Sequence, residues 1–144
     1  MMKVSKKQET LLLIIWTQSV LAIFGSLFYS EVMGYIPCDL CWYQRIFMYP
    51  LVIIYGAAIL KKDVNIALPG VVLSGIGILV SGYHYGLQKL PFLQDAGGIC
   101  GDVPCTSQYI NYFGFVTIPF FALIAFTLIF ICHLIMLKSK SISK

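Results

Sequence analysis

The stretch T-L-L-L-I-I-W-T-Q-S-V-L-A-I-F-G-S-L-F-Y-S, residues 10–30, contains no Asp, Glu, Lys or Arg. A helix needs about 20 apolar residues to cross the hydrocarbon core of a bilayer, so this stretch is long enough to span it. Residues 42–60 and 64–88 have the same character, with Arg45 as their only charge, and residues 103–137 carry no charge, although their first third is polar. The pattern predicts an all-α, four-helix transmembrane bundle formed by a single membrane domain, residues 1–144. The expected helices are residues 10–30, 40–60, 65–88 and 114–137.

The overall composition agrees with a membrane environment. Of the 144 residues, 59% are hydrophobic and 11% are charged, whereas a soluble domain is usually about 25% charged. The net charge of +4 does not indicate nucleic-acid binding, because the basic residues sit at the ends of apolar stretches and not in one patch. The first apolar run is longer than that of a signal peptide and no A-x-A-like site follows it, so it is expected to remain as a helix.

The basic residues predict the orientation in the membrane. Loops on the cytoplasmic side carry an excess of Lys and Arg. Eight of the ten basic residues precede the first helix, follow the last or lie between the second and third: Lys3, Lys6, Lys7, Lys61, Lys62, Lys138, Lys140 and Lys144. Of the basic residues, only Lys89 lies in the segments 31–39 and 89–113. Both termini are therefore expected in the cytoplasm, with these two segments outside.

Four of the five cysteines fall in the two expected outer loops. Cys38 and Cys41 form C-D-L-C where the second helix begins, and Cys100 and Cys105 lie in the second loop. Structural disulfides, a zinc site with four thiolates, and thiol–disulfide exchange all use such pairs. Zinc is disfavoured because neither loop contains His, and no metal is expected. A C-x-x-C ring closes a very short loop and stabilises little, which favours a reactive role for the first pair.

Two polar residues in the apolar segments suggest a site beside Cys41. Arg45 lies one helical turn below Cys41, where a cation would favour a thiolate, although snorkelling to the outer headgroups would also explain it. His84 is expected at a similar depth on the third helix, although a hydrogen bond within the bundle would account for it equally well. A cation, an imidazole and a thiolate together suit a lipid-soluble electron acceptor whose oxygens gain negative charge on reduction.

Three motifs carry a resemblance to a known family. They are P-C-D-L-C-W-Y-Q-R (37–45), Y-H-Y-G-L (83–87) and the stretch from Cys105 through Y-F-G-F-V-T-I-P (112–119). Together with four helices and a second outer cysteine pair, they resemble the DsbB family of bacterial disulfide-forming membrane proteins, including its BdbC-type members. The resemblance extends over nearly the whole chain. Only four residues separate Cys100 from Cys105, fewer than in better-known members.

The resemblance implies an electron relay in the bacterial cytoplasmic membrane. Family members reoxidise a DsbA-like, thioredoxin-fold thiol oxidase outside the cytoplasm and reduce a quinone, either menaquinone or ubiquinone. By analogy, Cys100 would form the mixed disulfide with the partner, Cys105 would exchange with Cys38, and Cys41 would contact the quinone as a thiolate. Arg45 and His84 match the positions of the family's quinone-site arginine and histidine. Cys132 matches no motif, and we expect it to pack in the bundle.

Three other functions compete with this relay. A scaffold stapled by two disulfides would leave the cysteines inert, but outer loops this short offer little recognition surface. A carrier that delivers reductant outward would need a thiol pair on the cytoplasmic half, where only Cys132 is expected. A quinone enzyme like vitamin-K-epoxide reductase would carry its C-x-x-C late in the chain, whereas here this motif opens the second helix.

Overall fold

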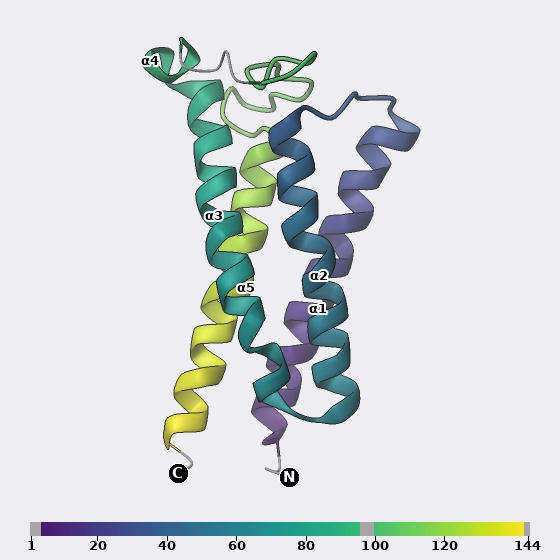
Figure 1. Cartoon of the computed structure of the whole chain (residues 1–144), viewed down its shortest axis with the longest axis vertical. Coiled ribbons are helices and arrows are strands. Elements are labelled where there is room, and N and C mark those ends of the chain that lie inside the picture. Colours follow the sequence, from purple (N-terminus) through teal and green to yellow (C-terminus); the bar gives the residue numbers. More distant parts are fainter. Residues whose placement is uncertain (1–3, 96–99, 143–144) are drawn as a thin grey trace.

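The computed structural model describes residues 4–95 and 100–142, with side chains up to Ser139. Its elements are α1 (Lys6–Leu27), the π-helical turn η1 (Phe28–Val32), α2 (Asp39–Lys61), the 3-10 turn η2 (Val64–Ala67), α3 (Leu68–Lys89), α4 (Pro91–Gln94) and α5 (Ile118–Ile142). The four long helices form an upright bundle, with the start of α1 and the end of α5 at the same end of it (Figure 1). All four are long and apolar enough to cross a membrane, which confirms the predicted fold class. The relation of both ends to the cytoplasm stays a prediction.

The first helix begins earlier than its apolar stretch. Ser5 and Gln8 form a capping box in which the Ser5 hydroxyl accepts from the Gln8 amide at 3.3 Å and the Gln8 side chain accepts from the Ser5 amide at 3.1 Å. Such a box satisfies two backbone donors that have no partner within the helix. The polar segment before residue 10 therefore becomes helical, and the expected start at residue 10 was too late.

The expected start of the last helix at residue 114 is wrong, because a tight turn precedes it. Phe113 and Gly114 have φ angles of 55° and 80°, outside the range of a right-handed helix. The Tyr112 and Val116 backbones pair across this turn at 3.0 Å. The helix α5 consequently starts at Ile118, and it continues to Ile142, past the predicted end at residue 137.

Each long helix packs against two others, in the ring α1–α2–α3–α5. Their shared core includes Leu12, Leu51, Tyr55, Phe126 and Ile129. Glycines on α3 admit the largest of these side chains, since a Cβ atom at Gly70 would collide with the Tyr55 ring and one at Gly77 with the Phe126 ring. By contrast, a Cβ atom at Gly82, which forms a G-x-x-x-G spacing with Gly86, would meet only Leu123, at 3.9 Å. Close helix packing thus depends on Gly70 and Gly77.

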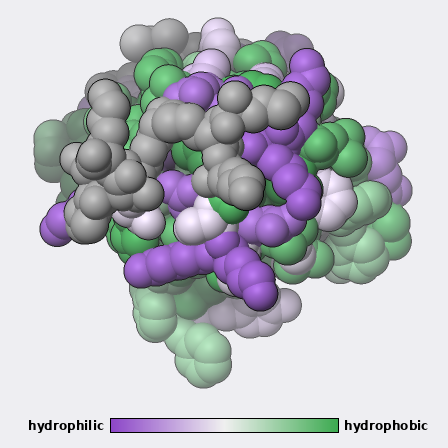
Figure 2. All heavy atoms as spheres, turned by 90° about the horizontal axis from the view of Figure 1, so that it is seen from below, coloured by the Kyte–Doolittle hydropathy of each residue, from purple (hydrophilic) through white to green (hydrophobic). Residues whose placement is uncertain are grey.

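Most of the described lysines lie at the end of the bundle that holds the termini. Lys6 and Lys7 begin α1, Lys61 ends α2, and Lys62 follows it and pairs with Glu9 at 3.8 Å. Figure 2 looks at this end and shows hydrophilic side chains among hydrophobic ones. Lys3 and Lys144, and the side chain of Lys140, lie outside the described residues.

At the opposite end, Lys89 organises the second loop. Its ammonium donates to the Gln108 side chain at 3.3 Å, to Asn111 at 3.4 Å and to the Gly114 carbonyl at 2.7 Å. The Tyr85 hydroxyl donates to the Phe115 carbonyl at 3.1 Å. These bonds fold the segment after Cys105 back onto the end of α3. The same loop carries the short helix α4 and both cysteines of the second pair.

Candidate functional site

The first cysteine pair straddles the start of α2. Cys38 has extended backbone angles and precedes the helix, while Cys41 lies in its first turn. Their Sγ atoms are 3.1 Å apart, and both are free thiols. Cys38 is buried and Cys41 half-buried. The carboxylate of Asp39 suits a first turn because it faces the positive end of the helix dipole. The local sequence thus holds one sulfur on each side of the helix boundary.

The second pair forms a disulfide, Cys100–Cys105, with the Cα atoms 5.9 Å apart. Cys105 is 1% exposed, whereas Cys100 is partly exposed. Cys38, Cys105 and Leu87 form a small buried cluster against which Cys41 and Cys100 pack. The structure therefore brings together the four cysteines that the topology assigned to one end. Their individual roles stay predictions.

Asp39 connects the two loops directly. Its Oδ2 atom accepts a hydrogen bond from the backbone amide of Gly101, at 2.7 Å. Gly101 follows Cys100, and Asp39 lies between Cys38 and Cys41. This hydrogen bond therefore links the loop of the second cysteine pair to the start of α2. The sequence gives no indication of this role for Asp39.

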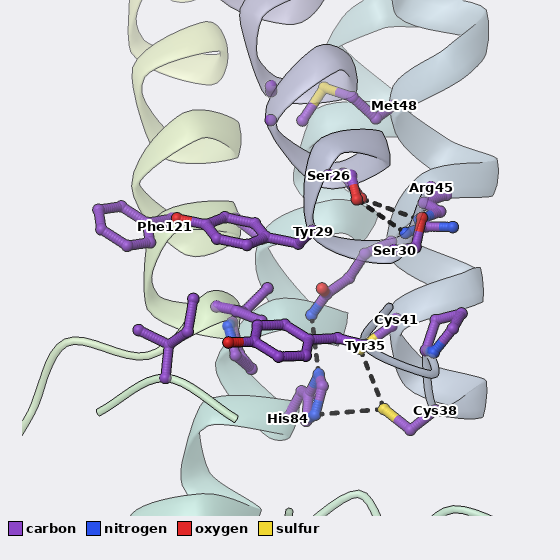
Figure 3. Close-up of a pocket in the computed structure, with 18 of the residues that line it drawn as sticks. Ser26, Tyr29, Ser30, Tyr35, Cys38, Cys41, Arg45, Met48, His84 and Phe121 are labelled. Carbon is purple, nitrogen blue, oxygen red and sulfur yellow. Dashed lines mark hydrogen bonds between the residues drawn. The ribbon is translucent and has the colours of Figure 1, made fainter. Parts of the chain in front are cut away.

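The side chain of His84 lies between the two pairs. It is 1% exposed, and its Nε2 atom is 3.5 Å from Cys38 Sγ and 3.2 Å from the Cys105 carbonyl oxygen. Its Nδ1 atom is 3.2 Å from Nε2 of Gln44. Figure 3 shows this contact of His84 with Cys38. His84 thus lies beside Cys38, and its expected place at a quinone stays a prediction.

Arg45 turns into the bundle and not toward the headgroups. It is 7% exposed, and it donates to the Ser26 hydroxyl at 2.8 Å and to the Ser26 carbonyl at 2.9 Å. The guanidinium carbon also lies 5.3 Å from the centre of the Trp42 ring, within the range of a cation–π contact. Ser26, on α1, is a residue that sequence reasoning missed, because a serine in an apolar helix gives no distinguishing signal.

A cavity of about 450 Å³ opens between α1, α2, α5 and the outer loops. It is lined by Tyr29, Tyr35, Cys41, Arg45, Met48 and Phe121 among others. Pockets for organic ligands usually have volumes of about 300–1,000 Å³ and mostly apolar walls with a few polar groups. Figure 3 shows the Cys38–His84 contact at one end of this cavity and Met48 at the other.

Two stacked tyrosines join the outer loops beside the cavity. The rings of Tyr35 and Tyr109 are 5.0 Å apart and nearly parallel, and Tyr29 stacks on the other side of Tyr35 at 6.3 Å. All three line the cavity. Aromatic residues often form a belt at membrane interfaces, a place that would suit the exposed Trp42 and Tyr43. Tyr35 and Tyr109 instead contribute to the site.

The electrostatic environment favours a thiolate at Cys38. A hydrogen bond from the Cys41 thiol and the contact with His84 lower the pKa of Cys38 below the ordinary thiol value of 9.0, against the opposing effect of burial. The thiolate is the nucleophile in thiol–disulfide exchange. The sulfur that faces the second pair is thus the one whose surroundings favour negative charge.

The geometry does not favour a structural zinc site with four protein ligands. The ligand atoms of Cys38, Cys41 and His84 lie within 4.8 Å of one another. Structural zinc sites use four ligands, and no fourth Cys, His, Asp or Glu joins this group in the part of the chain that is described. His84 also already contacts the Cys105 carbonyl. The expectation that no metal is bound stays a prediction.

The remaining cysteine and histidine lie apart from this site. Cys132 is partly buried and packs against the core of the bundle, as expected. The adjacent His133 is fully buried, and its Nδ1 atom is 2.6 Å from the Tyr55 hydroxyl. No prediction from the sequence concerned His133. Neither residue lines the cavity.

A four-helix membrane bundle with two adjoining cysteine pairs at one end defines a membrane thiol–disulfide exchange protein. The family model for disulfide bond formation protein DsbB matches residues 8–136. The chain is 60% identical over 141 residues to a probable disulfide formation protein of Oceanobacillus iheyensis, covering 97% of each chain. It is 46% identical over 126 residues to disulfide bond formation protein C of Bacillus subtilis, covering 88% of this chain and 91% of the relative. No solved structure matches.

The chain therefore belongs to the DsbB family. It is a multi-pass membrane thiol:disulfide oxidoreductase with a role in disulfide bond formation. This assignment disfavours a scaffold with inert cysteines.

Proposed function

We propose that the chain reoxidises a DsbA-like, thioredoxin-fold dithiol oxidase and passes the electrons to a membrane quinone. The protein would lie in the bacterial cell membrane with its redox cysteines on the extracytoplasmic side. One observation carries the proposal: the two cysteine pairs adjoin each other, and Cys41 of the first pair lines a cavity that also contains Arg45. Two electrons that pass from a soluble dithiol to a lipid-soluble quinone need such a pair of adjoining sites.

Exposure supports entry of electrons at Cys100. Cys100 is partly exposed, whereas Cys105 is 1% exposed. A partner thiolate attacks Cys100 Sγ, a mixed disulfide forms, and Cys105 leaves with the electron pair of the broken bond. The second partner thiol then attacks its own mixed disulfide and releases Cys100. The partner gains a disulfide, and the second pair becomes a dithiol.

The close packing of Cys105 and Cys38 supports the next exchange. The Cys105 thiolate attacks Cys38 Sγ of an oxidised first pair, so the Cys105–Cys38 bond forms and Cys41 leaves as a thiolate. Cys100 then attacks Cys105 Sγ and restores the Cys100–Cys105 disulfide, and Cys38 leaves as a thiolate. Two electrons have moved to the first pair. Free Cys38 and Cys41 beside a closed Cys100–Cys105 disulfide would be the state that this step produces.

The residues around the cavity fit a quinone ring. Met48, Phe121 and Phe126 supply apolar walls, and Arg45 supplies a buried cation that can stabilise oxygen atoms as they gain charge. When bound, a quinone accepts two electrons and two protons. Menaquinone and ubiquinone both fit this chemistry.

The charge distribution supports the proposed orientation. The described lysines at the ends of α1, α2 and α5 gather at the end of the bundle away from the four cysteines. Because cytoplasmic segments carry an excess of basic residues, the cysteine end would face the extracytoplasmic side.

The test is reduction of ubiquinone and menaquinone analogues by the purified protein in detergent, with a reduced thioredoxin-fold dithiol oxidase as donor. Quinone absorbance should fall with catalytic turnover. Cys41→Ser should abolish turnover, whereas Cys132→Ala serves as a matched control and should retain it. Absence of turnover with either quinone, from protein whose four outer cysteines are intact, would overturn the proposal.

A further inference from the structure

We infer that His84 is a catalytic residue of the exchange between the two cysteine pairs, holding Cys38 as the leaving thiolate through its Nε2 proton, and that Gln44 positions it by fixing that tautomer. This inference rests on the relay proposed above. It assigns His84 to thiol–disulfide chemistry, whereas the sequence analysis expected it at the quinone.

Two independent contacts specify which ring nitrogen carries the proton. The Cys105 carbonyl oxygen can only accept a hydrogen bond, so Nε2 of His84, 3.2 Å away, must donate. The Gln44 side-chain nitrogen can only donate, so Nδ1 of His84, 3.2 Å away, must accept. Both contacts require the same neutral imidazole, protonated on Nε2. Gln44 and His84 are 6% and 1% exposed, so water does not readily replace either contact.

The Nε2 proton also faces Cys38, whose Sγ lies 3.5 Å away. A donor at this position stabilises a sulfur that carries negative charge. In the second half of the exchange, Cys100 attacks Cys105, the Cys105–Cys38 bond breaks, and Cys38 takes the electron pair. The hydrogen bond strengthens as this charge develops and lowers the barrier for departure of Cys38. His84 does not give up its proton, so the step balances without another acid.

The same proton connects the position of the loop with the charge on Cys38. Since the Cys105 carbonyl and Cys38 Sγ both approach Nε2, His84 holds the second pair beside the first while the sulfurs exchange. Other charged or titratable groups near this point are Cys41 and Arg45 on α2. Asp39 is bonded to Gly101, and Lys89 to the loop residues 108–114.

The experiment uses the full-length protein in detergent, labelled with ¹⁵N-histidine and ¹³C-cysteine, with the first pair reduced. Two-bond ¹⁵N–¹H couplings identify the protonated nitrogen of His84, and the Cys38 Cβ shift follows the thiolate through a pH titration. We expect Nε2–H in the native protein. Gln44→Met, which keeps the side-chain volume and removes the donor, should mix the tautomers and raise the pKa of Cys38 by about 1. Electron transfer between the pairs should slow about tenfold.

The control is Gln88→Met, which also removes a buried amide. Gln88 lies one turn from His84 on α3 and donates to the Ser107 carbonyl, not to His84. It should leave the His84 tautomer and the Cys38 titration unchanged. An Nδ1-protonated His84 in the native protein would overturn the inference whether or not Gln44→Met folds. An unchanged Cys38 titration in a folded Gln44→Met would also overturn it. Neither readout needs quinone or partner, so both are independent of the proposed relay.

Discussion

The guanidinium of Arg45 donates two hydrogen bonds to Ser26 on the neighbouring helix α1, one to its hydroxyl at 2.8 Å and one to its carbonyl at 2.9 Å. Both acceptors are neutral. Within residues 4–95 and 100–142, no carboxylate lies within ion-pair distance of this cation. A buried charge that is oriented but not neutralised is well suited to stabilise negative charge on a ligand in the adjoining cavity.

Removing this cation should therefore weaken the use of quinone. We expect Arg45→Met to raise the KM for quinone at least about tenfold, since hydrogen bonds to charged groups are worth about 1.5–3 kcal/mol. The KM for the protein partner should not change. Ser26→Ala should act in the same direction but less strongly, whereas Ser19→Ala, a buried serine on the same helix that bonds Ile15, should have no effect. An unchanged quinone KM in Arg45→Met would make Arg45 a structural residue only.

The contact between Asp39 and Gly101 should set the rate of exchange between the pairs. Asp39→Ala removes the acceptor of a 2.7 Å bond. We expect electron transfer from the second pair to the first to slow about fivefold, because one net hydrogen bond contributes about 1 kcal/mol. Rapid-mixing experiments with trapped thiols measure this step. Asp102→Ala, at an exposed acid in the same loop, is the matched control, and equal slowing in both variants would argue against a specific contact.

Substitutions of two α3 glycines should show which of them is needed for close helix packing. Gly77→Ala would drive a methyl group into the Phe126 ring, and we expect a loss of about 1–3 kcal/mol in unfolding free energy. Gly82→Ala meets only Leu123 at 3.9 Å, so it should be neutral or slightly stabilising. Thermal unfolding in one detergent compares the two variants. A larger loss of unfolding free energy in Gly82→Ala than in Gly77→Ala would show that the close approach does not depend on Gly77.

The reduced protein should retain a thiolate at Cys38 below the ordinary pKa of a thiol. Hydrogen bonds from Cys41 and His84 to its sulfur lower the pKa of Cys38 below the ordinary value of 9.0. This lowered value stabilises the folded dithiol form. The stabilisation is complete above pH 9.0 and is lost as the pH falls through the lowered pKa of the folded protein. Thiolate absorbance should thus persist at neutral pH, and its disappearance near pH 8 would contradict this environment.

The helices could be predicted from the apolar stretches, but their ends depended on local geometry. The Ser5–Gln8 capping box extended α1 into a charged segment. A search for apolar stretches cannot find such a segment, because its residues are not apolar. At the other end of the chain, Phe113 adopts a φ of 55° that bulky residues rarely adopt. An apolar run containing Phe113 and Phe115 gives no sign of that turn, so the last helix was placed four residues too early.

The predicted topology placed both cysteine pairs at one end of the bundle, so their clustering could be predicted. The side-chain contacts around the cluster could not, because the depth of a residue in the membrane does not determine how its helix is rotated. His84 and Arg45 were expected to share a site at one depth. Both line the cavity, but His84 contacts Cys38 while Arg45 contacts Ser26. Gln44 offered a usable signal, an amide beside Arg45 in an apolar helix, whereas Ser26 and Tyr109 offered none.

The boundary of α2 passes through the C-x-x-C motif, with Cys38 in the loop and Cys41 in the first turn. In the proposed relay, Cys38 exchanges with Cys105 of the outer loop, and Cys41 meets a quinone dissolved in lipid. Two electrons then pass from the protein thiols to the lipid phase over the 3.1 Å between Cys38 and Cys41. Neither the soluble dithiol partner nor the quinone has to cross the headgroup layer. Lengthening the motif by one residue would break this connection while preserving each half of the chemistry.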